Sequence, residues 1–119
     1  MPKKPMSPKL RLLKSKIETE LDDTVKKGSC ILYSQLAENL GGYAPDSKYI
    51  ALCLGRLQDA DTKYNRPLRS ALVVRKDTGR PGSGFFDYAK LLGYKFRDED
   101  AFWRKQIRGL IGDSVTIPI

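Results

Sequence analysis

Histidine is absent from this chain of 119 residues, and cysteine occurs twice, at Cys30 and Cys53. The lack of histidine excludes Cys₂His₂ zinc sites, nucleophile triads with an imidazole base, and proton transfer through imidazole. The cysteines form no Cys-x-x-Cys pair, and they are too few for a disulfide framework. Clustered carboxylates and a convincing nucleophile are also missing. We therefore expect no metal, no cofactor and no enzymatic activity.

Long hydrophobic runs are missing as well, since no apolar segment approaches the roughly 20 residues of a membrane span. Residues 1–8 carry positive charge without the apolar stretch of a secretory signal. Hydrophobic residues make up 40% of the chain and charged residues 30%, as in globular proteins in water. We expect a cytoplasmic protein of one domain with no membrane contact.

Acidic residues are few compared with basic ones: 14 Asp and Glu against 22 Lys and Arg give a net charge of +8. Such a balance is typical of proteins that contact phosphates, although it also attracts acidic proteins. The imbalance is greatest in residues 63–86, which hold six cations and one acid, Asp77. Clustered cations repel each other unless an anion neutralises them. This stretch therefore indicates contact with nucleic acid.

Apolar residues that recur every three or four positions predict helices in most of the chain. Leu10, Leu13, Ile17 and Leu21 predict a helix that starts at Lys9 and ends near residues 22–23. Asp46 or Ser47 would cap a later helix, and Asp98 would cap the last one, which Gly112 stops. The other predicted elements are helices at 33–40, 47–59 and 85–92, a strand at 72–74 and a turn at 76–79.

The order of these elements predicts a mainly α domain with a small β wing, similar to a winged helix-turn-helix. The helices at 33–40 and 47–59, joined through Gly41 and Gly42, form the expected helix-turn-helix. The second of them would be the recognition helix, which usually enters the major groove of DNA. Residues 69–84 would be the wing. This domain would span 9–112, between a flexible basic arm at 1–8 and a tail at 113–119 that forms a last strand or frays.

Three short motifs resemble the DNA-binding domain of the alkylguanine-DNA alkyltransferases and of their inactive alkyltransferase-like relatives. They are Ile31-Leu32-Tyr33-Ser34-Gln35-Leu36-Ala37, then Leu54-Gly55-Arg56-Leu57, then Leu68-Arg69-Ser70-Ala71-Leu72-Val73-Val74. They occur in the family's order at similar distances, within residues 29–84. The resemblance implies that Tyr33 presses on a target phosphate and helps to rotate a nucleotide out of the stack.

The same resemblance shows where this chain departs from the family. Ser70 stands at the position of the reactive cysteine, and Ala71 and Leu72 replace the histidine and arginine that follow it. Without that histidine Ser70 has no base, so alkyl transfer is not expected. Leu52 stands where the family has the arginine that fills the gap left by a flipped base, so base flipping is not carried over either.

We predict a non-enzymatic protein that binds nucleic acid, with double-stranded DNA favoured and RNA as an alternative, through the 47–59 helix and the 69–84 wing. A second hypothesis is a protein-interaction module or inhibitor that binds an acidic partner protein. The glycine-rich 79–84 segment lacks the Gly-Lys-Ser/Thr ending of a nucleotide-binding loop. The residues expected to contact nucleic acid are Tyr33, Lys48, Tyr49, Arg56, Arg69, Ser70, Arg75, Lys76 and Arg80.

Overall fold

The computed structural model describes residues 6–44 and 47–112, which form one mainly α domain. In these ranges the elements are α1 (Pro8–Lys27), β1 (Ile31–Leu32), α2 (Tyr33–Asn39), α3 (Lys48–Lys63), the 3₁₀ helix η1 (Arg69–Leu72), β2 (Val73–Val74), α4 (Ser83–Leu91) and α5 (Glu99–Ile111). The helices expected from the sequence are therefore present. No helix in the described ranges is long and apolar enough to cross a membrane.

Helix α1 is longer than its sequence pattern predicts. It begins at Pro8, with the Ser7 side chain accepting a hydrogen bond from the Leu10 amide, and it continues to Lys27 because Thr24 extends the buried stripe by one turn. Gly28 then ends the helix in the left-handed region, at φ 65°. The rest of the expected arm, residues 1–5, and the expected tail at 113–119 lie outside the described residues.

The two strands form a parallel pair, with Ile31 opposite Val73 and Leu32 opposite Val74. A wing would be an antiparallel hairpin, and the 69–84 segment instead contains η1, β2 and a turn. In that turn the Gly79 amide donates to the Arg75 carbonyl at 2.8 Å, and the Arg75 amide donates to the Arg80 carbonyl at 2.8 Å. The coarse fold class is thus confirmed, while the winged-helix topology is not.

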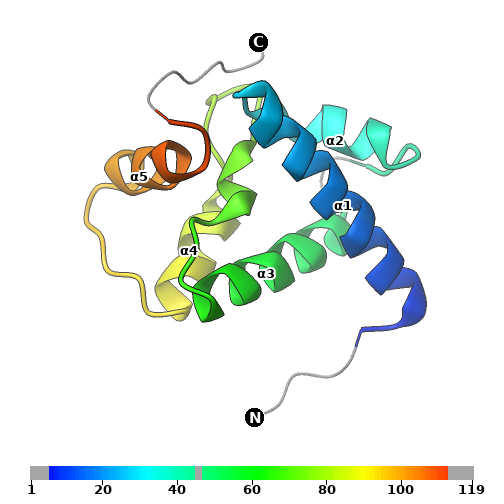
Figure 1. Cartoon of the computed structure of the whole chain (residues 1–119), viewed down its shortest axis with the longest axis horizontal. Coiled ribbons are helices and arrows are strands. Elements are labelled where there is room, and N and C mark those ends of the chain that lie inside the picture. The colour runs from blue at the N-terminus through cyan, green and yellow to red at the C-terminus, as the bar shows by residue number, and fades with distance from the viewer. Residues whose placement is uncertain (1–5, 45–46, 113–119) are drawn as a thin grey trace.

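The segment that contains η1 runs through the middle of the domain, with α1 on one side and α5 on the other (Figure 1). Leu68 and residues 71–74 are completely buried there. Two side chains of α5 hold this segment from one side. The Trp103 indole N–H donates to the Ala71 carbonyl at 2.9 Å, and the Gln106 side-chain oxygen accepts from the Leu68 amide at 3.0 Å. These bonds satisfy backbone groups of a short 3₁₀ turn, which a longer helix would satisfy internally.

Candidate functional site

Asp61, near the end of α3, also holds η1 in place. This helix runs four residues past the predicted end at Asp59, because Asp61 is itself completely buried. Its carboxylate accepts from the Arg69 amide at 3.0 Å and from the Arg69 guanidinium at 3.0 Å. The Arg66 guanidinium adds a third contact at 3.0 Å. Asp61 therefore fixes the backbone one residue before Ser70.

The Ser70 hydroxyl oxygen lies in the domain interior without a hydrogen-bond partner among the described residues. Only 3% of Ser70 is exposed, so this oxygen is also shielded from water. Most buried polar atoms in proteins do find a partner, because an unsatisfied one costs about 1–3 kcal/mol. The backbone on both sides of Ser70 is fixed by the bonds to Gln106, Asp61 and Trp103. The hydroxyl is thus held in place with its hydrogen-bonding capacity unused, and a ligand reaches it only when the side chains that cover it move aside.

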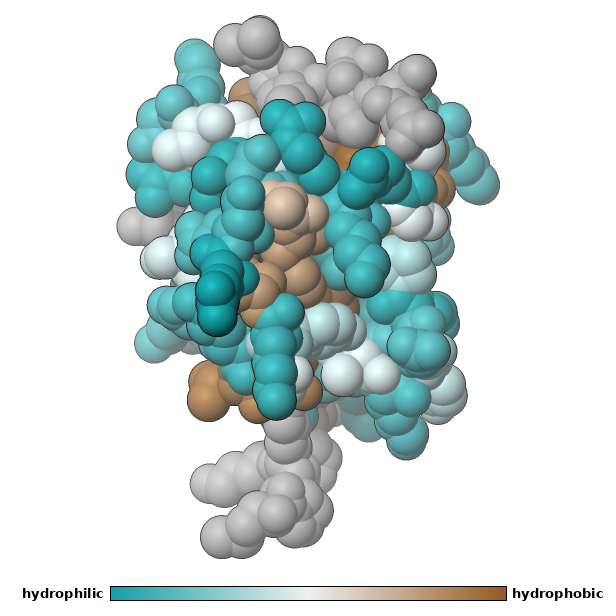
Figure 2. All heavy atoms as spheres, turned by 90° about the vertical axis from the view of Figure 1, so that its left-hand side faces the viewer, coloured by the Kyte–Doolittle hydropathy of each residue, from teal (hydrophilic) through white to brown (hydrophobic). Residues whose placement is uncertain are grey.

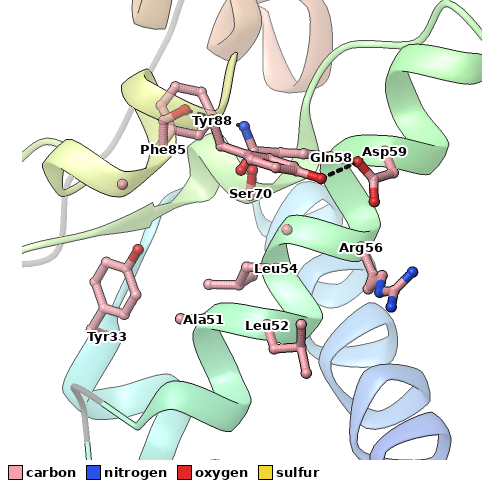
Figure 3. A pocket seen from close by; sticks show the side chains of 12 residues that line it. Tyr33, Ala51, Leu52, Leu54, Arg56, Gln58, Asp59, Ser70, Phe85 and Tyr88 are labelled. Atoms are coloured by element: carbon pink, nitrogen blue, oxygen red, sulfur yellow. Dashed lines mark hydrogen bonds between the residues drawn. The ribbon is translucent and has the colours of Figure 1, made fainter. Parts of the chain in front are cut away.

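Ser70 faces a hollow of about 460 Å³ between α3, α4 and the start of α2. This volume is in the range of small-molecule sites. Most of the lining is apolar, including Leu54 and Gly55 of α3 and Phe85 of α4. Figure 3 shows Tyr33 on one side of the hollow and Ser70 with Tyr88 on the opposite side. Polar groups therefore lie at the edges of a mainly apolar space.

Two hydrogen bonds join α3 to α4 behind this hollow. The Gln58 side-chain amide donates to the Phe85 carbonyl at 3.2 Å, and the Tyr88 hydroxyl donates to the Asp59 carboxylate. These contacts fix the separation of the two helices that form the walls. Hydrogen bonds between α3 and α4 therefore hold two walls of the hollow together.

Tyr33 is half-buried at the first position of α2 and carries a hydroxyl into the hollow. Burial raises the pKa of this phenol, although the positive charge of Arg75 acts in the opposite direction. The hydroxyl consequently stays protonated and keeps a hydrogen to donate. An anionic acceptor that approaches Tyr33 would also meet the exposed Arg75.

The cations of the 69–84 segment are largely neutralised by acids elsewhere in the chain. Burial lowers the pKa of Arg69, but hydrogen bonds and charges from Asp61 and Glu18 outweigh this and raise it. Its side chain is only 15% exposed. Arg80 pairs with Glu99 at 3.1 Å. The argument that these cations need an external anion is therefore wrong for Arg69 and Arg80.

Arg75 and Lys76 are in a different position, because both are exposed. The hydrogen bond to Asp77 and its negative charge raise the pKa of Arg75, and the hydrogen bond from Arg75 lowers the pKa of Asp77. Both side chains are more than half exposed, so a phosphate can compete for the Arg75 guanidinium. Among the residues that the structure describes, Lys76 forms no ion pair.

The remaining predicted residues lie on α3. Lys48 and Tyr49 are exposed in its first turn, and the Lys48 ammonium lies 5.6 Å from the centre of the Tyr49 ring. Arg56 and Leu52 line the hollow, and Leu52 is 44% exposed at its rim. The structure thus groups Tyr33, Arg56 and Ser70 around one hollow, with Arg75 near Tyr33, and it leaves Arg69 and Arg80 in internal ion pairs.

Sequence reasoning missed the α4 wall of the hollow and the supports of η1. Phe85 and Tyr88 have the spacing of a helix, and this spacing gives no sign of a cavity. Asp61 lies beyond the end of the helix predicted at 47–59, and no local signal indicates that its side chain is buried. The described residues contain no group of three or more potential ligands that could hold a metal ion.

Comparison with protein-family models, curated proteins and solved structures found no match to this chain. The resemblance to the alkyltransferase DNA-binding domain therefore rests on the three motifs quoted above.

Proposed function

We propose that this protein is a non-enzymatic nucleic-acid-binding protein that holds one unstacked base of double-stranded DNA in the hollow beside Ser70. The observation that carries the proposal is the buried Ser70 hydroxyl, which is fixed in place, has no hydrogen-bond partner among the described residues and borders a mainly apolar hollow. A base has two apolar faces and a polar edge. It would pack against Leu54 and Phe85 while its edge bonds to Ser70.

Charges around the hollow support a polyanionic ligand. Tyr33 offers a protonated hydroxyl, and Arg75 and Lys76 lie on the exposed turn that follows β2. A phosphate next to the extruded base would contact these groups, and each such contact releases counterions. Lys48 in the first turn of α3 adds a further exposed cation. Arg69 and Arg80 are excluded from this contact surface because internal acids bind them.

Leu52 offers a route to unstacking in a chain that has no arginine at this position. Its side chain is 44% exposed at the rim of the hollow. Proteins that kink DNA often insert an apolar side chain between base steps. We assign this wedge role to Leu52, which would fill the stack after the base enters the hollow.

The geometry does not favour catalysis. The Ser70 oxygen has no base within hydrogen-bond distance among the described residues, so nothing there would take its proton. The proposed role is therefore recognition without reaction, as the resemblance to the inactive alkyltransferase-like proteins implies.

A fluorescence anisotropy titration tests the proposal with two duplexes that differ in one base pair, one fully paired and one with a central mismatch. Extrusion costs least for a mispaired base, so we expect tighter binding to the mismatched duplex. Tyr33→Phe and Leu52→Ala should remove most of that preference. Absence of binding at low salt, or binding without a salt dependence, would refute the nucleic-acid function. Equal affinity for both duplexes would refute the base-holding role alone.

A further inference from the structure

A second surface lies at the connection between α4 and α5. A shallow hollow of about 560 Å³ is lined there by Lys90, Tyr94, Lys95, Phe96 and Arg97. The three basic residues are exposed. Figure 2, which looks at the α4 and α5 side of the molecule, shows a narrow apolar strip framed by hydrophilic side chains. The lining of the hollow thus combines three cations with the aromatic side chains of Tyr94 and Phe96.

Internal acids do not neutralise this surface. In the described part of the chain, Lys90, Lys95 and Arg97 form no ion pair with a carboxylate. The acids that follow Arg97 are engaged elsewhere. Asp98 accepts from the Ala101 amide at 3.1 Å, and Glu99 pairs with Arg80. The 69–84 segment differs, because three of its four basic residues, Arg69, Arg75 and Arg80, form ion pairs with carboxylates.

The aromatic rings of this surface are not available to stack on nucleic-acid bases. Phe96 is stacked on Phe102, with ring centres 4.1 Å apart, and the Lys90 ammonium lies over the Phe96 ring at 5.3 Å. A planar ring cannot hold both on one face, so both faces of Phe96 are occupied. The Tyr94 ring packs against Phe102, and its hydroxyl shares a hydrogen bond with Thr62. A single strand would find no base platform here.

Apolar area remains at the edge of the surface. Leu91, which follows Lys90 at the end of α4, is 80% exposed and is the most exposed large hydrophobic residue in the described ranges. A phosphate backbone offers no apolar group that such a side chain could contact. A peptide that carries carboxylates on both sides of an apolar residue matches both features.

This surface is also separate from the hollow beside Ser70. Tyr88 lines that hollow and Lys90 lines the present one. On a helix of 3.6 residues per turn, positions two apart point in nearly opposite directions. Helix α4 therefore stands between the two sites, and a ligand on one leaves the other accessible.

We propose that the surface formed by Lys90, Leu91, Lys95 and Arg97 docks an acidic, amphipathic segment of a partner protein. The cations pair with carboxylates of the segment, and Leu91 contacts its apolar side chain. The inference is independent of DNA binding, because none of these residues belongs to the site beside Ser70.

The test uses three fluorescein-labelled probes. The first is a synthetic peptide with Asp-Glu pairs on both sides of a Leu-Phe pair, the second carries Ser-Ser in place of Leu-Phe, and the third is a short DNA duplex. The protein variants are Lys95→Glu with Arg97→Glu, and Leu91→Ser. The matched control is Lys26→Glu with Lys27→Glu, which makes the same change in net charge at the exposed end of α1.

We expect the wild type to bind the first peptide and the Lys95 and Arg97 double variant to bind it at least about tenfold more weakly. The control should stay within about twofold of the wild type. Leu91→Ser should weaken binding of the Leu-Phe peptide and leave the Ser-Ser peptide unaffected. In amide spectra of the wild type, the first peptide should shift residues 90–97.

Four results would overturn the proposal. They are no binding of the Leu-Phe peptide by the wild type, equal losses in the double variant and the control, and equal affinity for the two peptides. The fourth is a double variant that loses the duplex while it keeps the peptide, because the surface would then be a phosphate contact.

Discussion

Replacement of Asp61 tests whether one buried carboxylate fixes the segment that carries Ser70. The Asp61 side chain is 0% exposed, and its partner Arg69 is 15% exposed. Asp61→Ala leaves the Arg69 guanidinium with Glu18 alone and removes the acceptor of the Arg69 amide. Breaking a buried ion pair on one side costs about 3–5 kcal/mol. Because Glu18 remains and is 36% exposed, we expect the lower end, about 3 kcal/mol.

Urea unfolding followed by Trp103 fluorescence measures this loss, since the buried indole bonds to Ala71 beside Ser70. The control is Arg66→Ala. It also removes an ion-pair partner of Asp61, but the Arg66 side chain is 50% exposed. It should cost at most about 1 kcal/mol. In thermal unfolding, Asp61→Ala should lower the Tm by roughly 12 °C, at about 4 °C per kcal/mol.

If the free energy of unfolding of Asp61→Ala is within about 1 kcal/mol of the wild-type value, the Asp61 carboxylate does not hold η1 in place. The double variant Asp61→Leu with Arg69→Met separates stability from positioning, since buried ion pairs are often replaced by apolar residues at little cost. We expect it to recover most of the stability. It should not recover preference for the mismatched duplex, because the Arg69 amide still lacks its acceptor.

Three further predictions concern single residues. Ser70→Ala should raise the free energy of unfolding by about 1 kcal/mol, because it removes a buried oxygen that has no partner among the described residues. The same variant should bind DNA more weakly. A clear loss of stability would mean that this oxygen is hydrogen-bonded in the native state. Burial raises the pKa of Cys30 from 9.0 to about 11, so its thiol should react with a disulfide reagent at near-neutral pH far more slowly in the native protein than in urea. Because the native state disfavours the Cys30 thiolate, this residue leaves stability unchanged below pH 9.0 and reduces it as pH rises from 9.0 to about 11, which denaturation across that range measures. Lys76→Ala should lower the slope of log affinity against log salt by about 1, whereas Lys26→Ala at the far end of α1 should leave it unchanged; equal slopes would remove Lys76 from the DNA contact.

Local sequence signals predicted the helices and several of their ends correctly. Ser47 and Asp98 cap α3 and α5 with their side chains, and Gly112 ends α5. These features depend on residues within one or two turns of each other, which a single sequence displays directly.

The strand pairing and the charge balance depend on contacts that are distant in the sequence. Val73 pairs with Ile31, and the Arg69 guanidinium pairs with Glu18, 51 residues away. A count of charges in residues 63–86 includes Asp77 but not Glu18 or Glu99. The density of cations therefore overstated the positive charge that this segment presents to a ligand.

The positions of the cations that form no ion pair bear on the two functions that the sequence left open, which are binding of nucleic acid and binding of an acidic protein. With Arg69 and Arg80 neutralised, the cations beside Ser70 are fewer than the sequence indicated, and the case for DNA there depends more on the shape of the hollow than on charge. Exposed cations without an ion pair in the described ranges also occur at Lys95 and Arg97, in the connection between α4 and α5. As proposed, nucleic-acid binding and acidic-protein binding would use different surfaces. Variants of Lys95 and Arg97 should therefore leave the mismatch preference intact.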